Sequence, residues 1–441
     1  MAFLQFTILH AFILALELYF LIYFLERIAN RYVFLELLSL IAISQWLLAP
    51  MIAERIGFKM DVPYHEYYSY ALPGTLLYVF GLTLPLWNHK KLDLRISDII
   101  SKLKLKYQGK DGLAVSLFII GLPCWVFQNH VPPALSFLFY LMGQFMMMSV
   151  CLMIFTESRF KWLLILGGFS VILATSFFNG MVGIAIFWAF IVFMMYSTAY
   201  PIKLPTIIKA AGLIIGVWIM IVLQVAKTEY RSQTWASFNY EGTSNISRES
   251  TQDPILFYQL ITEHLFRPRE LLRNRNAIPF IMRLNQGYLV SHGMDYVPDR
   301  RSFGNGEVTL MNTAIAFIPR MLWKDKPIVG QAEYYKKYTG IQLGRSTSAT
   351  LGALGDAYVD FGKGGIIFLG ILGATISLLF SSWMKLSSNT PSLFLWFVGI
   401  YYVSLSVSEV SVAGYINSIF KFIIFIIIMR FVLKKMLHIP L

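Results

Sequence analysis

Long apolar stretches, each about the length needed to cross a lipid bilayer, recur along most of the 441-residue chain. A transmembrane helix needs roughly 20 mostly apolar residues to cross about 30 Å of hydrocarbon. Hydrophobic residues make up 57% of the chain and charged residues 14%, which is too apolar for one water-soluble core. We therefore expect an all-α polytopic integral membrane protein. About eleven spans are predicted, near residues 3–25, 33–53, 70–87, 112–129, 134–155, 162–178, 180–198, 208–226, 364–384, 392–413 and 416–433.

Basic residues are distributed unequally between the predicted loops. One alternating set of loops and the C-terminal tail carries 17 Lys and Arg residues, whereas the opposite short loops carry only Arg55 and Lys59. Because cytoplasmic loops are enriched in Lys and Arg, we expect a multi-pass membrane protein with its N-terminus outside and its C-terminus cytoplasmic. The first span lacks a preceding positive charge and is expected to be retained rather than cleaved. The net charge of +13 then reflects topology, and no nucleic-acid partner is expected.

This topology divides the chain into three parts. Residues 1–226 hold the first eight spans, residues 227–363 form one large, partly helical external (periplasmic) loop, and residues 364–441 hold the last three spans. On the cytoplasmic side, apolar residues at helical spacing beside lysines predict a helix lying on the anionic leaflet over about 90–110. The apolar residues of that helix are Ile96, Ile99, Ile100 and Leu103.

Ionisable residues inside apolar spans are costly and need partners. Glu17 and Glu36 lie in the first two spans, where they face the bundle in a structural or a functional role. Glu409 and Lys421 lie near the outer ends of the last two spans. We expect these two residues to form an ion pair, with a substrate contact as the alternative. No cluster of His or Cys has metal-ligand spacing, so neither a metal site nor a cofactor is expected.

The first half of the predicted external loop is rich in arginine. The planar guanidinium suits bidentate recognition of phosphate and keeps its charge near a membrane. The arginines predict an anionic substrate at the outer membrane face, and a solvated, ion-paired surface is the alternative. They are Arg231, Arg248, Arg267, Arg269, Arg273, Arg275, Arg283, Arg300 and Arg301.

The second half of this loop carries several short motifs. IPRMLWKDKP occupies 318–327, RSTS occupies 345–348, and GALGDAYVDFGKGG at 352–365 opens a predicted span. Together with IMRLNQGYLVSHGMDYVPD at 281–299 and GNGE at 304–307, they resemble the Wzy-type bacterial oligosaccharide repeat-unit polymerases. The resemblance covers about 85 residues. It departs from the family pattern at Asp356 and Asp360, where glutamate and asparagine are more usual.

The resemblance implies a multi-pass membrane glycosyltransferase of the bacterial inner (cytoplasmic) membrane, of GT-C-like architecture, that polymerises O-antigen or exopolysaccharide repeat units. Such enzymes move a glycan from one undecaprenyl diphosphate carrier to the sugar on a second carrier, outside the membrane and without a nucleotide sugar, and inversion at the sugar carbon is expected. The expected partners are therefore undecaprenyl-diphosphate-linked oligosaccharides, membrane lipid and a chain-length-regulating co-polymerase. An O-antigen ligase, which transfers the glycan to a lipid core, is an alternative, and a polysaccharide or lipid transporter is another.

Candidate site residues follow from this chemistry. Fixed cations at the interface stabilise the charge that grows on a diphosphate leaving group. The candidates for this role are Arg283, Arg320, Lys326 and Arg345. The incoming hydroxyl must lose a proton to a base, and the candidates, in order of preference, are Glu307, Asp356 and His292.

Each candidate also has a structural interpretation. Arg320 and Lys326 could extend their charged ends from an interfacial helix over Met311 to Trp323. Glu307 could form a structural salt bridge with Arg300 or Arg301.

Overall fold

All the regular structure of the described chain is helical. The computed structural model describes residues 7–128, 130–178, 182–235, 254–267, 271, 278–318, 323, 331–343 and 349–435. The first half contains α1 (Ile8–Arg27), α2 (Phe34–Ile43), the π-helix η1 (Ser44–Leu48), α3 (Ala49–Arg55), α4 (Tyr64–Thr83), η2 (Leu84–Asn88), α5 (His89–Tyr107), α6 (Asp111–Phe127), α7 (Pro133–Met153), α8 (Lys161–Phe178), α9 (Val182–Ala199) and α10 (Thr206–Trp235).

Shorter helices follow before the chain returns to the bundle. They are α11 (Pro254–Phe266), α13 (Ile278–Leu284), α14 (Gln286–Tyr296), the π-helix η3 (Glu307–Met311), α15 (Asn312–Phe317), α16 (Gln331–Thr339), α17 (Gly352–Phe361) and the one-turn η4 (Gly362–Gly364). The last long helices are α18 (Gly365–Asn389), α19 (Ser392–Ser404) and α20 (Val412–Lys435).

Seven helices of the described chain are long and apolar enough to cross a membrane. They occupy Ile8–Arg27, Phe34–Arg55, Tyr64–Tyr107, Leu135–Met153, Thr206–Tyr230, Gly352–Asn389 and Val412–Lys435. Four shorter apolar helices lie at Asp111–Phe127, Lys161–Ser176, Gly183–Ala199 and Ser392–Ser404. The all-α polytopic membrane fold predicted from the apolar stretches is therefore confirmed, while the number of spans, eleven, stays a prediction.

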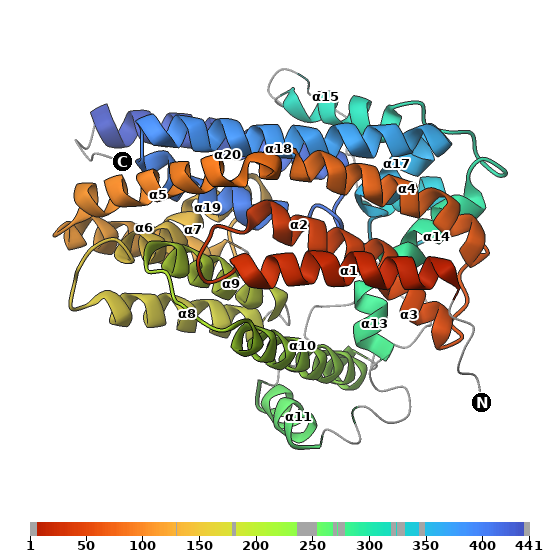
Figure 1. Ribbon diagram of the computed structural model, residues 1–441, viewed down its shortest axis with the longest axis horizontal. Helices are drawn as coiled ribbons and strands as arrows, with labels where there is room; N and C mark the ends of the chain where they lie inside the picture. Colours follow the sequence, from red (N-terminus) through yellow and green to blue (C-terminus); the bar gives the residue numbers. More distant parts are fainter. Residues whose placement is uncertain are drawn as a thin grey trace.

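The long helices run side by side in one bundle (Figure 1). Close contacts between backbones hold α4 against α18. A Cβ added at Gly81 would lie 2.5 Å from the carbonyl oxygen of Gly370, and one added at Gly373 would lie 2.2 Å from the carbonyl oxygen of Tyr78. Small residues at such crossings let helices approach closely. In a membrane this close packing stabilises helix association, because moving apolar side chains from lipid into protein gives little hydrophobic free energy.

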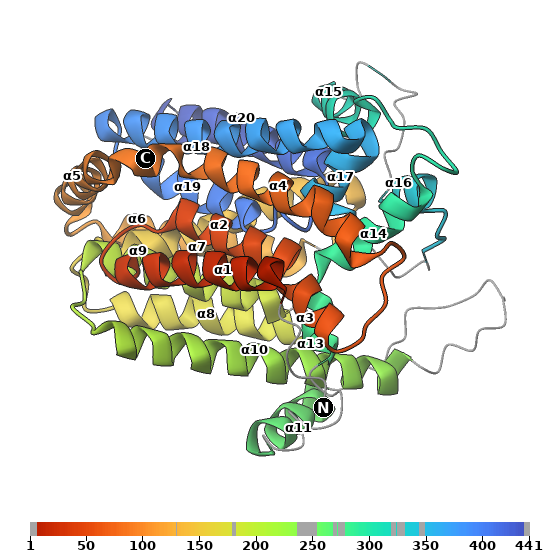
Figure 2. The same ribbon diagram turned by 45° about the vertical axis from the view of Figure 1, so that its right-hand side comes forward.

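The helix α5 lies across one end of the bundle and is seen nearly end-on in Figure 2. Its apolar residues Ile99 and Leu103 are fully buried, because α5 packs against α18 and α9. Two of its lysines also bind carbonyl oxygens at the ends of these helices: Lys102 donates to Ser388 at 3.0 Å and Lys104 to Ala199 at 2.6 Å. The predicted helix is present, but its apolar face packs on protein and does not face lipid.

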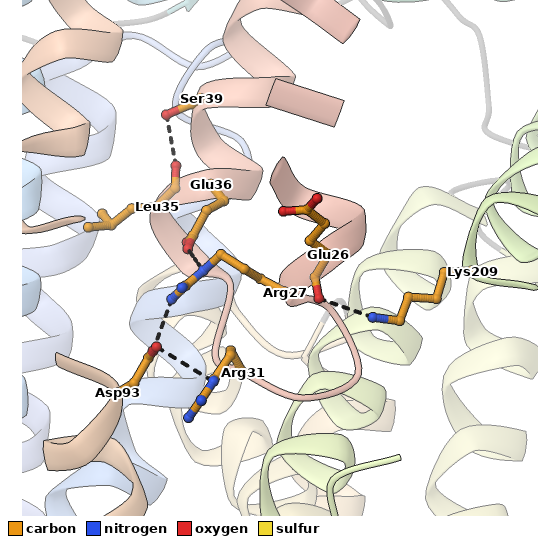
Figure 3. A network of polar contacts seen from close by, with 8 residues as sticks. All are labelled: Glu26, Arg27, Arg31, Leu35, Glu36, Ser39, Asp93 and Lys209. Atoms are coloured by element: carbon orange, nitrogen blue, oxygen red, sulfur yellow. Dashed lines mark hydrogen bonds and ion pairs between the residues drawn. The ribbon is translucent and has the colours of Figure 1, made fainter. Parts of the chain in front are cut away.

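A buried network of charged residues fixes the same end of the bundle (Figure 3). The Arg27 guanidinium donates to Glu36 at 2.7 Å and to Asp93 at 2.9 Å, and Arg31 lies 3.5 Å from Asp93. Lys209 donates to the backbone oxygen of Glu26 at 3.1 Å. These bonds join α1, α2, α5 and α10, so Glu36 has a structural role here.

The opposite end carries four described helices of the segment predicted to be external, whereas α11 of the same segment lies beside α10. These four are α13, α14 and α17, which lie towards the end where α1 begins in Figures 1 and 2, and α16, which Figure 2 shows beside α14; α20 ends on the other side. The predicted interfacial helix over Met311 to Trp323 is shorter than expected, because α15 ends at Phe317. The Phe317 ring packs against that of Phe420 in α20, with centroids 4.3 Å apart.

Candidate functional site

The corner between α13 and α14 brings the external segment against the bundle. Asn285 ends α13 and caps α14, because its side-chain oxygen accepts a hydrogen bond from the backbone N–H of Tyr288 at 3.1 Å. At Gly287 an added Cβ would lie 2.7 Å from both the Tyr67 hydroxyl and a ring carbon of Pro50. Only glycine lets α14 pack this closely on η1, α3 and α4.

Arg283, one of the predicted phosphate ligands, lies at this corner. Its guanidinium forms an ion pair with Glu409, in the connection between α19 and α20, at 2.6 Å. Gln45 donates to the other carboxylate oxygen at 2.7 Å and accepts from Ser408 at 2.5 Å. The predicted pair of Glu409 with Lys421 is therefore wrong, because Arg283 takes the carboxylate.

The π-helix η1 is what presents Gln45 to this connection. A π-helix adds a residue to a helical turn and changes the direction of the side chains around it. Ser44, next to Gln45, donates to Glu17 of α1 at 2.7 Å. In consequence η1 joins α1 on one side and the α19–α20 connection on the other, and Glu17 has a hydrogen-bond partner inside the bundle.

His292 lies two turns into α14 and pairs with Asp61 in the loop before α4. The Asp61 carboxylate is bonded to Nδ1 of the imidazole. The side chain of His292 is mostly buried against the rings of Tyr288 and Tyr335, whose centroids lie 4.4 and 6.5 Å away. Among the described residues Nε2 has no hydrogen-bond partner. A carboxylate on Nδ1 fixes the ring so that Nε2 can accept a proton.

Asp356 and Asp360 are both fully buried in α17. Asp356 accepts from the Tyr334 hydroxyl and from the backbone N–H of Val412 at 2.8 Å, which caps α20. Asp360 accepts from the backbone N–H groups of Val308 at 3.0 Å and Thr309 at 2.7 Å, and from the Thr309 hydroxyl at 2.7 Å. Both carboxylates are thus occupied in holding other elements onto α17.

Gly352 allows α17 to begin against the same α19–α20 connection. Its φ of +67° is one that side chains disfavour, and an added Cβ would lie 2.2 Å from the backbone oxygen of Ser408. The hydroxyl of Thr350 donates to the backbone oxygen of Glu409. The GALGD motif therefore packs directly beside the residue that binds Arg283.

Glu307 begins η3 and is held by α16. Lys337 forms its ion pair, and the Tyr338 hydroxyl donates to it at 3.0 Å. Burial alone would raise the pKa of Glu307, but the hydrogen bonds from Lys337 and Tyr338 and the positive charges of Lys337 and Arg301 hold this pKa below its usual 4.5. The carboxylate is ionised at neutral pH.

The predicted structural salt bridge of Glu307 has a different partner from those expected. Lys337 takes the place of Arg300 or Arg301. Arg300 lies 3.6 Å from Asp295, and the Arg301 guanidinium lies 5.2 Å from the centre of the Tyr338 ring.

The helix α16 connects the three candidate bases. Tyr334 bonds Asp356, Lys337 and Tyr338 bond Glu307, and Tyr335 packs beside His292. Arg283 and Asp356 both contact the stretch from Glu409 to Val412. The other predicted phosphate ligands, Arg320, Lys326 and Arg345, lie outside the described residues.

Three residues that contact the candidate site residues, Asp61, Gln45 and Tyr334, belong to none of the predicted sets. Asp61 and Gln45 contact their partners across large separations in the chain, 231 positions for Asp61 and His292 and 364 for Gln45 and Glu409, whereas Tyr334 lies 22 positions before Asp356. Side-chain spacing carries no signal over such distances. Among the described residues no three His, Cys, Asp or Glu side chains gather in a way that could hold a metal.

A crevice between α2, α18, α19 and α20 is separate from these polar contacts. Aromatic and aliphatic side chains line it, including those of Phe34, Phe380, Trp383 and Phe397. None of the predicted site residues in the described part of the chain is among its lining residues.

Comparison with known proteins identifies no relative. No family model matches the chain, and neither a curated protein nor a solved structure is significantly similar to it.

Proposed function

We propose that this chain is an inner-membrane glycosyltransferase that joins undecaprenyl-diphosphate-linked oligosaccharide repeat units into a surface polysaccharide. In this proposal the four shorter apolar helices are spans, so the chain crosses the membrane eleven times in a GT-C-like architecture. The beginning of α1 and the end of α20 lie at opposite ends of the bundle (Figure 1), as an odd number of crossings requires. The motifs at 281–299, 304–307 and 352–365 support the class of reaction.

In the proposed membrane orientation, α13, α14, α16 and α17 lie outside the membrane and α5 lies on the cytoplasmic side. The support for this orientation is the excess of Lys and Arg in the loops on the α5 side. Single cysteines at Lys336 and Ser101, both exposed, test it in a chain whose Cys124 and Cys151 are replaced by alanine. An impermeant thiol reagent should label position 336 in intact spheroplasts, and position 101 only after lysis. The opposite pattern would reverse the proposed orientation.

The observation that carries the proposed function is the setting of Arg283. Its side chain is 52% exposed although Glu409 and Gln45 fix the position of its guanidinium. Only one of its nitrogens bonds Glu409, and Nε and the second terminal nitrogen have no partner among the described residues. A positioned guanidinium with an unused edge can bind two oxygens of a phosphate. Such a group stabilises a diphosphate as it leaves the sugar.

In this mechanism His292 is the base. The acceptor sugar hydroxyl gives its proton to Nε2 as its oxygen bonds to the anomeric carbon of the donor. The bond from that carbon to the diphosphate oxygen breaks, and the electron pair leaves with undecaprenyl diphosphate, whose charge Arg283 offsets. Asp61 bonds Nδ1 and so orients the imidazole with Nε2 as the nitrogen that takes the proton. Because the acceptor oxygen attacks the anomeric carbon on the side opposite to the departing diphosphate, the configuration at that carbon inverts.

The two carboxylates considered first are less suited to this role. Asp356 is fully buried and both its oxygens are bonded. Glu307 is ion-paired with Lys337, and its lowered pKa makes it a weak base. We assign to both the positioning of α16 and α17 around the site.

The profile of surface polysaccharide in a host strain that lacks the protein tests this function. A polymerase deletion should leave single repeat units on the lipid core and remove the ladder of longer chains. Loss of single units and ladder together would favour the ligase alternative. An unchanged profile would contradict both.

A further inference from the structure

Two consecutive side chains beside Arg283 carry buried polar atoms without partners. Asn285 and Gln286 are 2% and 3% exposed. The Asn285 oxygen caps α14, but its amide nitrogen Nδ2 has no hydrogen-bond partner. In Gln286 it is the oxygen Oε1 that has none. One residue therefore offers a donor, and the next offers an acceptor.

The position of these atoms sets them apart from the other buried, unpartnered polar atoms of the described chain. Many of those are single hydroxyl or indole groups within the long helices, such as those of Tyr78 in α4 and Trp188 in α9. Asn285 and Gln286 are adjacent and lie two and three positions after Arg283. They sit at the corner where α14 meets η1, whose Gln45 is bonded to the carboxylate that holds Arg283.

Unpaired buried amides are unfavourable, and native proteins retain few of them without a partner such as water or a ligand. A ligand that satisfies both atoms must present an acceptor to Nδ2 and a donor to Oε1. A sugar hydroxyl does both, and an acetamido group does so with its carbonyl oxygen and its N–H. A sugar joined to a diphosphate also places such groups next to the phosphate, as Asn285 and Gln286 lie next to Arg283.

We infer that Asn285 and Gln286 form a subsite for the sugar that carries the diphosphate, recognising a hydroxyl or acetamido group near the anomeric carbon. This inference rests on the proposed function, because it takes the lipid diphosphate as the neighbouring group. It adds a specificity-determining pair to the site: Arg283 binds the diphosphate that every carrier shares, and Asn285 and Gln286 distinguish a carrier with a sugar from one without.

Two substitutions remove the unpartnered atoms with little change of shape. Gln286→Met has a similar volume and takes away Oε1. Asn285→Ser keeps a side-chain oxygen that can cap α14 and takes away Nδ2. Gln144 provides a matched control, because its Oε1 is also buried without a partner, in the distant helix α7. Neither Gln286→Met nor Gln144→Met should lower the melting temperature, since each removes an unpaired buried acceptor.

The measurement is the affinity of the purified full-length protein, in detergent, for three lipids: undecaprenyl diphosphate, the same lipid carrying glucose, and the same lipid carrying N-acetylglucosamine. We expect the wild type to bind at least one sugar-bearing lipid about tenfold more tightly than the bare diphosphate, since one or two hydrogen bonds are gained. The glucose and N-acetylglucosamine arms show whether the hydroxyl or the acetamido group is recognised.

The ratio of the affinity for the sugar-bearing lipid to the affinity for bare undecaprenyl diphosphate should fall towards one in Gln286→Met and Asn285→Ser. The affinity for the bare diphosphate itself should stay unchanged in both variants. In Gln144→Met the ratio should stay as in the wild type. A ratio of one in the wild type, or an unchanged ratio in both site variants, would overturn the subsite and indicate that ordered water satisfies the two amides. Failure of the proposed function is distinguishable, because the bare diphosphate would then bind the wild type no better than Arg283→Ala.

Discussion

Arg283 and Glu409 form an ion pair of 2.6 Å although 126 positions separate them in the chain. The pair joins α13 of the external segment to the connection between α19 and α20. Gln45 of η1 and the hydroxyl of Thr350 bind the same glutamate, through its side chain and its backbone. Four separate parts of the chain therefore determine where one half-exposed guanidinium lies.

Arg283→Lys tests whether the shape of this cation matters beyond its charge. Lysine keeps the attraction for phosphate but loses the planar pair of donors. We expect polymer synthesis to fall at least about tenfold with normal protein abundance, since a hydrogen bond to a charged group contributes about 1.5–3 kcal/mol. Arg267→Lys is the control, because Arg267 is an exposed arginine of the same segment, paired with Glu263. Full polymer from Arg283→Lys would show that no bidentate contact is made.

His292→Gln and Asp61→Asn test the assignment of the base. Glutamine cannot accept the hydroxyl proton, so His292→Gln should lower the turnover number by about 10²–10⁴ and leave the Michaelis constant for lipid-linked repeat units nearly unchanged. Asp61→Asn should act in the same direction, because an amide at this position no longer holds the ring in the tautomer whose Nε2 accepts the proton. Substitution of Glu307 by Gln should change turnover much less. A reversed order, with Glu307→Gln inactive and His292→Gln active, would transfer the role to Glu307.

The contribution of Glu307 to the stability of the fold should depend on pH. Since its pKa in the folded protein lies below the usual 4.5, the ionised carboxylate stabilises the fold above pH 4.5, and this contribution is lost as the pH falls through the lowered pKa. Wild type should therefore melt at a higher temperature than Glu307→Gln at pH 7, and the difference should close as the pH falls below 4.5 and through the lowered pKa. The exposed Glu333 of α16, the helix that also carries Lys337, provides the control Glu333→Gln. A difference that persists at acid pH would exclude the charge as its origin.

Substitution of Asp360 should lower stability more than substitution of Glu307. Asp360→Ala removes the acceptor for two buried backbone N–H groups and the Thr309 hydroxyl. Each buried donor left unpaired costs about 1–3 kcal/mol, so we expect a clear fall in melting temperature and in abundance. Asp360→Asn keeps one acceptor oxygen, so its melting temperature should lie between those of the wild type and Asp360→Ala. If Asp360→Ala were stable and only inactive, the aspartate would belong to the chemistry and not to the packing of η3 on α17.

The helical membrane fold could be predicted because apolar length is a local property of the sequence. The windows near 3–25 and 33–53 overlap α1 and the continuous stretch from α2 to α3. The environment of α5 could not be predicted in this way. Its apolar stripe fits a lipid surface and a protein surface equally well, and only the packing of α18 and α9 decides between them.

The candidate site was predictable only in part, for the same reason. Sequence motifs drew attention to Arg283, His292, Glu307 and Asp356, but their partners lie elsewhere in the chain. Nothing near Asp61 indicates a histidine partner 231 positions away, and the π-helix that presents Gln45 has no sequence signature. Lys421 was predicted to pair with Glu409 because the two are close in sequence and opposite in charge. The carboxylate of Glu409 instead pairs with Arg283, and the Lys421 ammonium lies 4.5 Å from the centre of the Phe137 ring.

The most direct test of the proposed glycosyl transfer uses the purified protein in liposomes with undecaprenyl-diphosphate-linked repeat units isolated from a polymerase-deficient host. Mass spectrometry of the lipid extract should show carriers with two and more repeat units, and one free undecaprenyl diphosphate for each new linkage. His292→Gln should yield neither. If the wild-type protein leaves every carrier with a single repeat unit and releases no undecaprenyl diphosphate, the chain is not a polymerase.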